Sequence, residues 1–376
     1  MKRGLRALVR WTHVWLGLIG GLVICLMGFT GGLVALRPPL ASLLSPAAPP
    51  VASCVASPDW DRAAKAASAI TGTELNRVYG PVGSDTRYRF RMATEDPILF
   101  KHVIYDACSD RILGTINFSW MDWTVDLHHN LLSGKTGRRA TGWMGLVMLI
   151  SSLSGLGLWL LSRPNLRTAF LITPRLSART PRELHRAIGI LAAILLTVEA
   201  FTGLWLAFPQ TMRGMLAVVV PIPTEARPPR PPKNGTPGEP AGLTAWVTAA
   251  RAALPDGSIR EIRLPEGGGP VQVRMWRPGD FRELGNNVVT VSGSTGKVLN
   301  VDLYGGKAAG TKIVQGMASL HYDEWGGLAF RIIAGLSGLM TPVLFVSGFL
   351  LWWLPKRRRV PAAKSARPAA EPVPVA

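Results

Sequence analysis

Long runs of apolar residues alternate with polar stretches along the chain, and four of these runs are long enough to cross a membrane. A bilayer core of about 30 Å needs about 20 residues of α-helix. A helix buried in a soluble domain is rarely apolar on every side over such a length. The pattern therefore predicts a helical membrane protein with four spans, at about residues 11–36, 141–161, 184–208 and 328–354.

The two long polar segments between these runs have the pattern of small α+β lobes. Each contains a helix-like stretch, residues 60–70 and 243–253, after a Pro-rich linker. The sequences TRYRFRM and VQVRMW then alternate polar and apolar residues with period two, as half-buried strands do. We therefore expect a helix packed on a small antiparallel sheet in each lobe.

These patterns divide the chain into eight parts. They are an N-terminal tail with the first span (1–37), the first lobe (38–122), a histidine-bearing segment with the second span (123–162), a basic loop (163–183), the third span (184–208), a Pro-rich linker with the second lobe (209–310), a histidine-bearing segment with the fourth span (311–354), and a basic tail (355–376).

The net charge is +19, and the distribution of the basic residues, rather than the size of the charge, indicates the membrane topology. Arg and Lys greatly outnumber acids in the N-terminal tail, the loop 163–183 and the tail 355–376. Basic segments next to spans stay in the cytoplasm. We therefore expect a multi-pass protein of a bacterial inner membrane, embedded in lipid, with both termini in the cytoplasm and both lobes in the periplasm. Nucleic-acid binding is disfavoured, since these basic segments do not form one surface.

The two halves of the chain are related by an internal repeat, which matches four of the six histidines in pairs. His13 aligns with His185 and His128 with His321, without gaps in the spans. The short motifs that align with them are Phe29-Thr30-Gly31 with Phe201-Thr202-Gly203, and Ser154-Gly155 with Ser347-Gly348. Because both halves run in–out–in, a pseudo-two-fold axis along the membrane normal would bring each pair of histidines face to face.

Two opposed neutral imidazoles in a helix bundle are the ligand set of a six-coordinate b-type haem. The sequence thus predicts two haem b groups per chain, one bound by His13 and His185 near the cytoplasmic face and one by His128 and His321 near the outer face. No CxxCH motif is present, so the haems would not be covalently attached. A purely structural role and a zinc site remain as alternatives, with His129 as the fallback outer ligand.

The segment that carries His128 poses a geometric problem, because about 13 helical residues separate it from the second span. A straight helix would hold the imidazole about 20 Å away from the membrane. We expect a break around residues 133–137, with a short helix folded back over the bundle.

Other residues with candidate roles are one acid, three arginines and two cysteines. Glu199 lies deep in a span, where an ionised carboxylate is costly, so it could bond a ligand, move a proton, sit near a quinone or simply be protonated. Arg138, Arg139 and Arg331 could pair with haem propionates or anchor the membrane interface. Cys54 and Cys108, both in the first external segment, are expected to form a disulfide, whereas Cys25 packs within a span.

The motifs VDLHHNLLSG, ASLHYDEWGG, WTHVWLGL and ELHRAIGI resemble those of the PepSY-associated transmembrane proteins, over nearly the whole chain. That family includes iron-regulated membrane proteins and inner-membrane ferric-siderophore reductases. The resemblance implies a haem-bearing four-helix bundle with PepSY-like lobes, with His13, His128, His185 and His321 at the family's histidine positions. It also implies reduction of ferric chelates in the periplasm.

The leading functional hypothesis is an enzyme, a haem-dependent reductase of a ferric siderophore or another ferric chelate. No cytoplasmic segment exceeds about 25 residues, too short for a flavin or nicotinamide domain. We therefore expect electrons from membrane quinol or a separate reductase. The alternative is a membrane-anchored PepSY binding or regulatory module without redox activity. A transporter ranks last, since no broken-helix site at mid-membrane is evident.

Overall fold

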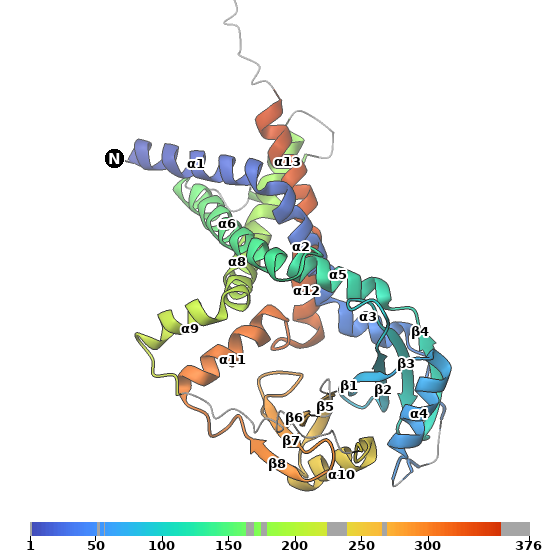
Figure 1. Cartoon of the computed structure of the whole chain (residues 1–376). Helices are drawn as coiled ribbons and strands as arrows, with labels where there is room; N and C mark the ends of the chain where they lie inside the picture. The colour runs from blue at the N-terminus through green and yellow to red at the C-terminus, as the bar shows by residue number, and fades with distance from the viewer. Residues whose placement is uncertain are drawn as a thin grey trace, which may run out of the picture.

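The computed structural model describes residues 2–50, 53–55, 57–162, 169–173, 179–223, 239–264 and 269–354. It places a helical bundle beside a single sheet domain (Figure 1). The expected basic tail, most of the loop 163–183 and the Pro-rich part of the second linker lie outside the described residues. Three helical segments are long and apolar enough to cross a membrane: α6 (Gly134–Leu161), α8 (Thr180–Ala207) and Gly327–Trp353, which consists of α12 (Gly327–Leu339) and α13 (Thr341–Trp353).

The first predicted span is not one straight helix. It consists of α1 (Lys2–Ile19) and α2 (Gly21–Ala35), which meet at an angle of 72°. The bend falls at two glycines, where a side chain would have no room. A Cβ at Gly20 would lie 2.9 Å from Val147, and one at Gly21 would lie 2.7 Å from the ring of Phe345. The described helices therefore give three spans, or four if the bent pair crosses as one.

The bundle packs closely where small residues face each other. α2 crosses α12 at glycines of both helices, and a Cβ at Gly32 would lie 2.5 Å from the carbonyl oxygen of Gly335. On the same interface, a Cβ at Gly338 would lie 2.5 Å from the carbonyl oxygen of Gly28. Close backbone approach of this kind is the usual means of helix association in lipid, where no hydrophobic force joins apolar helices.

A short helix folds back before the second span, as the sequence predicts. This helix, α5 (Ser119–Asn130), ends at Leu131 and is followed by α6 from Gly134. Leu131, Leu132 and Gly134 all have left-handed backbone conformations, with φ of 47°, 54° and 55°. Gly137 permits the tight turn, since a Cβ there would lie 1.5 Å from the carbonyl oxygen of Asn130.

The two predicted lobes share one antiparallel sheet, so they are not separate units. The strand order is β4-β3-β2-β1-β5-β6-β7-β8. The joint is the pairing of β1 with β5, in which Val78 faces Ile262. The strands are β1 (Leu75–Tyr79), β2 (Arg87–Met92), β3 (Lys101–Asp106), β4 (Arg111–Ile116), β5 (Ser258–Arg263), β6 (Val271–Trp276), β7 (Asn287–Val291) and β8 (Val298–Asp302).

One hydrophobic core lies between this sheet and the helices α4 (Trp60–Thr71) and α10 (Leu243–Ala253). Trp60 and Trp246 are buried in it, against apolar residues from both halves of the sheet. Asp61 of α4 also caps the start of α10 by accepting a hydrogen bond of 2.6 Å from the backbone N–H of Leu243. A shared core and a shared cap make the two lobes one folding unit.

The remaining described elements connect the sheet domain to the bundle. They are α3 (Arg37–Leu44), α9 (Pro209–Ala217) and α11 (Ala309–His321). A smaller apolar cluster joins Ala41 of α3 and Met121 of α5 to Ile104 of the sheet. Cys54 and Cys108 form a disulfide with a sulfur–sulfur distance of 2.00 Å, the pairing that we expected from their shared external segment.

Candidate functional site

The bundle brings the matched histidines together in two facing pairs. His13 of α1 faces His185 of α8, with 6.1 Å between the ring centroids. His128 of α5 faces His321 of α11, also with 6.1 Å between centroids. The inner pair (His13 and His185) and the outer pair (His128 and His321) lie at different levels. On α8, about 17 residues separate His185 from Thr202, which contacts His321, so the levels differ by roughly 25 Å along the helix.

His13 is held by α6. Its Nδ1 lies 3.0 Å from the carbonyl oxygen of Ser151 and 3.3 Å from the hydroxyl of Ser154. A Cβ at Gly155 would lie 2.9 Å from Cε1 of the ring, so the imidazole can occupy this position only because residue 155 has no side chain. A carbonyl oxygen only accepts hydrogen bonds, so Nδ1 carries the proton and Nε2 keeps its lone pair.

His185 is held by α13 in the same way. Its Nδ1 lies 3.0 Å from the carbonyl oxygen of Leu344 and 3.2 Å from the hydroxyl of Ser347. A Cβ at Gly348 would lie 3.1 Å from Cε1 of the ring. These three residues occupy the positions that match Ser151, Ser154 and Gly155 in the alignment of the two halves. Both inner histidines thus have the same tautomer and the same surroundings.

His128 of the outer pair is held by α2. Its Nδ1 lies 3.0 Å from the carbonyl oxygen of Met27 and 3.2 Å from the hydroxyl of Thr30. A Cβ at Gly31 would lie 2.8 Å from Cε1 of its ring. His129 adjoins His128 in sequence, but it is the ring of His128 that stacks against His321, with 27° between the ring planes.

His321 has a charged partner that the other three histidines lack among the described residues. Its Nδ1 lies 3.1 Å from the hydroxyl of Thr202 and 3.1 Å from Oε2 of Glu199. A Cβ at Gly203 would lie 3.0 Å from Cε1 of the ring. Glu199 is the counterpart of Met27 in the alignment, so a carboxylate stands beside His321 where His128 has a backbone carbonyl.

A second acid lies beside Glu199. Asp323 follows α11 and is buried next to the Glu199 carboxylate. Burial, and then the neighbouring Glu199 carboxylate, raise the pKa of Asp323. Asp323 therefore adds a second carboxyl group to the surroundings of His321 and Glu199.

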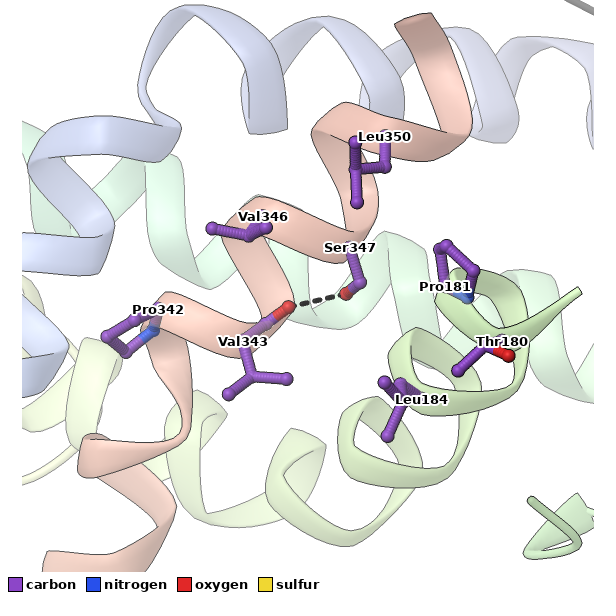
Figure 2. Close-up of a pocket in the computed structure, with 8 residues that line it drawn as sticks. All are labelled: Thr180, Pro181, Leu184, Pro342, Val343, Val346, Ser347 and Leu350. Carbon is purple, nitrogen blue, oxygen red and sulfur yellow. Dashed lines mark hydrogen bonds between the residues drawn. The ribbon is translucent and has the colours of Figure 1, made fainter. Parts of the chain in front are cut away.

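A cavity of about 480 Å³ adjoins the inner pair, between α8 and α13. Figure 2 shows Leu184 on α8 on the same side as Val343 and Ser347 of α13. Ser347 lines this cavity and also contacts His185. The lining of this cavity is almost entirely apolar.

The donor set of both pairs fits a haem. In each histidine Nδ1 is engaged by the protein, and Nε2 has no hydrogen-bond partner among the described residues. Two imidazoles that bind one metal ion through Nε2, with bonds of about 2 Å, have ring centroids roughly 6 Å apart. Both pairs have this separation, and glycine backbones rather than side chains flank the rings.

The three arginines proposed as partners of haem propionates differ in their surroundings. Arg138 donates to the carbonyl oxygen of Leu206 at 2.8 Å. Arg139 is exposed on α6. Arg331 is buried and forms an ion pair of 2.6 Å with Glu283 of the sheet domain. Arg331 therefore links the bundle to the sheet domain.

From the sequence, the serine, threonine and glycine residues that contact the histidines were recognised only as markers of the repeat. Each of these matched motifs contacts one histidine: Ser154-Gly155, Ser347-Gly348, Thr30-Gly31 and Thr202-Gly203. The signal that could have identified them was present, because each motif recurs with its histidine in both halves. What the sequence lacked was the information about which helix crosses which.

Comparison with known proteins agrees with this architecture. A search of curated protein sequences gives no match. The family model of the PepSY-associated TM region matches residues 10–354, which include both histidine pairs and the whole sheet domain. The chain therefore belongs to the PepSY-associated TM region family, and it is a membrane-embedded protein with an antiparallel sheet domain.

Proposed function

We propose that the protein is a dihaem membrane reductase, which carries electrons across the inner membrane to a ferric chelate, such as a ferric siderophore, in the periplasm. The observation that supports this most strongly is the repeated histidine geometry, with two facing pairs at two levels of one bundle and Nδ1 engaged in all four rings. A structural role needs neither a common tautomer nor a common separation. A zinc site needs about four ligands close together, whereas each pair offers two.

Bound there, two b-type haems would supply reversible one-electron transfer. The residues of the chain fix the ligands for that role. The carbonyl and hydroxyl oxygens hold the Nδ1 proton, so that the Nε2 lone pair is available without a change of tautomer. The glycines let the rings lie against the helix backbones. The inner pair would receive electrons and the outer pair would deliver them, since the outer pair lies next to the sheet domain.

The electron balance sets what else is needed. One electron converts one ferric chelate to the ferrous form, which chelators of this kind hold far less tightly. We propose membrane quinol as the donor, with a separate reductase as the alternative. A quinol releases two electrons and two protons on oxidation to the quinone, so it would reduce two chelates.

The first test is the visible spectrum of the detergent-purified protein, oxidised and then reduced, with a haem count per chain. The proposal expects a sharp reduced α-band and about two b haems per chain. Anaerobic addition of a ferric chelate to the reduced protein should then reoxidise it, with ferrous iron captured by a coloured trap. A colourless protein that does not take up added haem would refute the proposal and favour the binding or regulatory module.

A further inference from the structure

The face of the sheet that turns away from α4 and α10 carries a group of arginines. On β1 and β2, Val78 and Phe90 enter the core, so the alternate residues Arg77, Arg89 and Arg91 lie on the opposite face. Strand pairing sets them side by side, with Arg77 opposite Arg91. We call the following set the arginine face: Arg37 of α3, Arg77, Arg89, Arg91, Arg263 and Arg274.

Positive charge exceeds negative charge on this face. Asp122 pairs with Arg37 at 3.0 Å, and its other oxygen is engaged by His102. Glu261 is the carboxylate nearest to three of the arginines, at 2.9 Å from Arg77, 3.3 Å from Arg263 and 3.5 Å from Arg274. Only two carboxylates thus pair with members of this group of six arginines. The excess positive charge is what a bound anion would offset.

Two members of the group have neutral partners instead. Arg89 contacts Nδ1 of His102 at 3.3 Å and lies 4.3 Å above the ring of Tyr79. Arg91 donates to the amide oxygen of Asn76 and lies 3.8 Å above the ring of Phe100. Burial, and then the charge of Arg37, lower the pKa of Arg89 to about 10. Burial is the main cause of that shift, and the repulsion between Arg89 and Arg37 adds to it.

The positive charges of the arginines also act on Tyr79, which lies among them. Burial alone would raise the pKa of its hydroxyl, but the four nearest guanidinium groups outweigh burial and lower it. The Nε–H groups of Arg37 and Arg77 are also buried without a hydrogen-bond partner among the described residues. Buried donors without acceptors are costly, so an oxyanion at this place would satisfy them.

The arginine face is connected to both helices that bear the outer histidines. Asp122, the partner of Arg37, lies on α5 six residues before His128, about 9 Å along the helix. Arg274 adjoins Arg282, which pairs at 2.6 Å with Glu324, three residues after His321. Figure 1 shows α4 and α10 on the side of the sheet away from the bundle, so this face turns toward α5 and α11.

We propose that the arginine face binds an anionic ferric chelate, one whose iron is held by carboxylate or catecholate oxygens, beside the outer histidine pair. This inference rests on the proposed reductase function and names the charge class of its substrate. Planar guanidinium groups bind oxyanions through paired N–H donors. A neutral trihydroxamate chelate offers no charge to offset the arginines, so it is the weaker ligand.

The experiment measures binding without electron transfer. The full chain in detergent is titrated with the citrate complex of gallium(III), a redox-inert stand-in for ferric iron, and separately with a neutral gallium trihydroxamate. We expect the citrate complex to bind at least about tenfold tighter, as one charge-assisted interaction provides. Equal or weaker binding of the citrate complex than of the neutral chelate would overturn the proposal.

Variants then locate the site. Arg77→Gln and Arg274→Gln should each weaken gallium citrate binding about tenfold. Arg77→Lys keeps the positive charge, so this variant should lose less affinity for gallium citrate than Arg77→Gln does. The control is Arg62→Gln on α4, an exposed arginine that pairs with Asp110 on the far side of the sheet, which should bind as the wild type does.

The outcomes separate the two proposals. If Arg77→Gln and Arg274→Gln match Arg62→Gln in affinity, the anion does not bind here, whatever the reductase assay shows. If gallium citrate binding depends on the arginines but the reduced protein does not reduce ferric citrate, the reductase proposal fails and the binding site remains. Thermal unfolding of each variant shows that affinity and not folding has changed.

Discussion

The inner and outer histidine pairs have the same ring separation but differ in what holds their imidazoles. In the inner pair, both rings bond a backbone carbonyl and a serine hydroxyl at matched positions. In the outer pair, His128 bonds a carbonyl and a threonine, whereas His321 bonds a threonine and the carboxylate of Glu199. The inner pair is thus symmetric in its hydrogen-bond partners, and the outer pair is asymmetric by a single residue.

That difference has a chemical consequence for a metal bound at the outer pair. A carboxylate accepts the Nδ1 proton more strongly than a carbonyl does, so it gives the imidazole more electron density to donate. More electron density on the ligand favours the oxidised state of a bound iron and lowers its reduction potential. The outer site would then have the lower reduction potential of the two, which increases the driving force for electron transfer from it to a ferric chelate.

The largest expected effect comes from removing one ligand at a time. His185→Ala should reduce the haem content from about two to about one per chain, and His321→Ala should do the same at the other site. The remaining spectrum should differ between the two variants, because different haems survive. His129→Ala is the control and should keep both. Retention of both haems in His185→Ala and His321→Ala would break the ligand assignment.

The sequence predicted which histidines face each other in the structure, because matched motifs indicate which residues correspond in the two halves. It was not sufficient for Glu199, whose partner depends on the contact between α8 and α11. His321 lies far from Glu199 in the chain, and a hydropathy pattern says nothing about which face of a span an acid occupies. The sequence accordingly left its role open.

The fold likewise has features that the sequence predicted and features that it could not predict. Apolar length predicted the spans α6, α8 and Gly327–Trp353, since length and composition decide whether a helix can cross a membrane. It could not predict the bend at Gly20, because the apolar run continues through it. The pairing of β1 with β5 was also hidden, since an edge strand that meets another lobe has the same alternation as one that meets solvent.

The glycines that adjoin the histidines offer the next test. Gly155→Ala places a methyl group 2.9 Å from Cε1 of His13, so the ring must shift and the inner haem should bind more weakly or change its spectrum. Gly157→Ala on the same helix is the matched control, because its Cβ would meet only Val9 at 3.9 Å. The measurement is haem content and absorption of both variants. Identical behaviour of the two would mean that the inner imidazole does not need this close contact.

A smaller and more specific effect is expected from Glu199→Gln. The amide keeps the shape of the side chain and removes its charge, so the reduction potential of the outer haem should rise, on the order of 50 mV, close to the 59 mV that a tenfold change means for one electron. The inner potential should stay unchanged. Glu183→Gln, which alters an acid at the start of the same helix, is the control. A redox titration in which both potentials stay at their wild-type values would show that the carboxylate does not tune the outer site.

The smallest effect is expected where the two halves are most alike. Ser154→Ala and Ser347→Ala each remove one hydroxyl from Nδ1 of an inner histidine but leave the carbonyl oxygen at 3.0 Å, which still fixes the tautomer. The loss should be at most about 1 kcal/mol, or a few-fold in haem affinity, and it should be equal in the two variants because their contacts match. Haem transfer to an acceptor protein measures it. Unequal losses would mean that the inner pair, like the outer one, is asymmetric, and that the symmetry of its hydrogen bonds does not extend to its energetics.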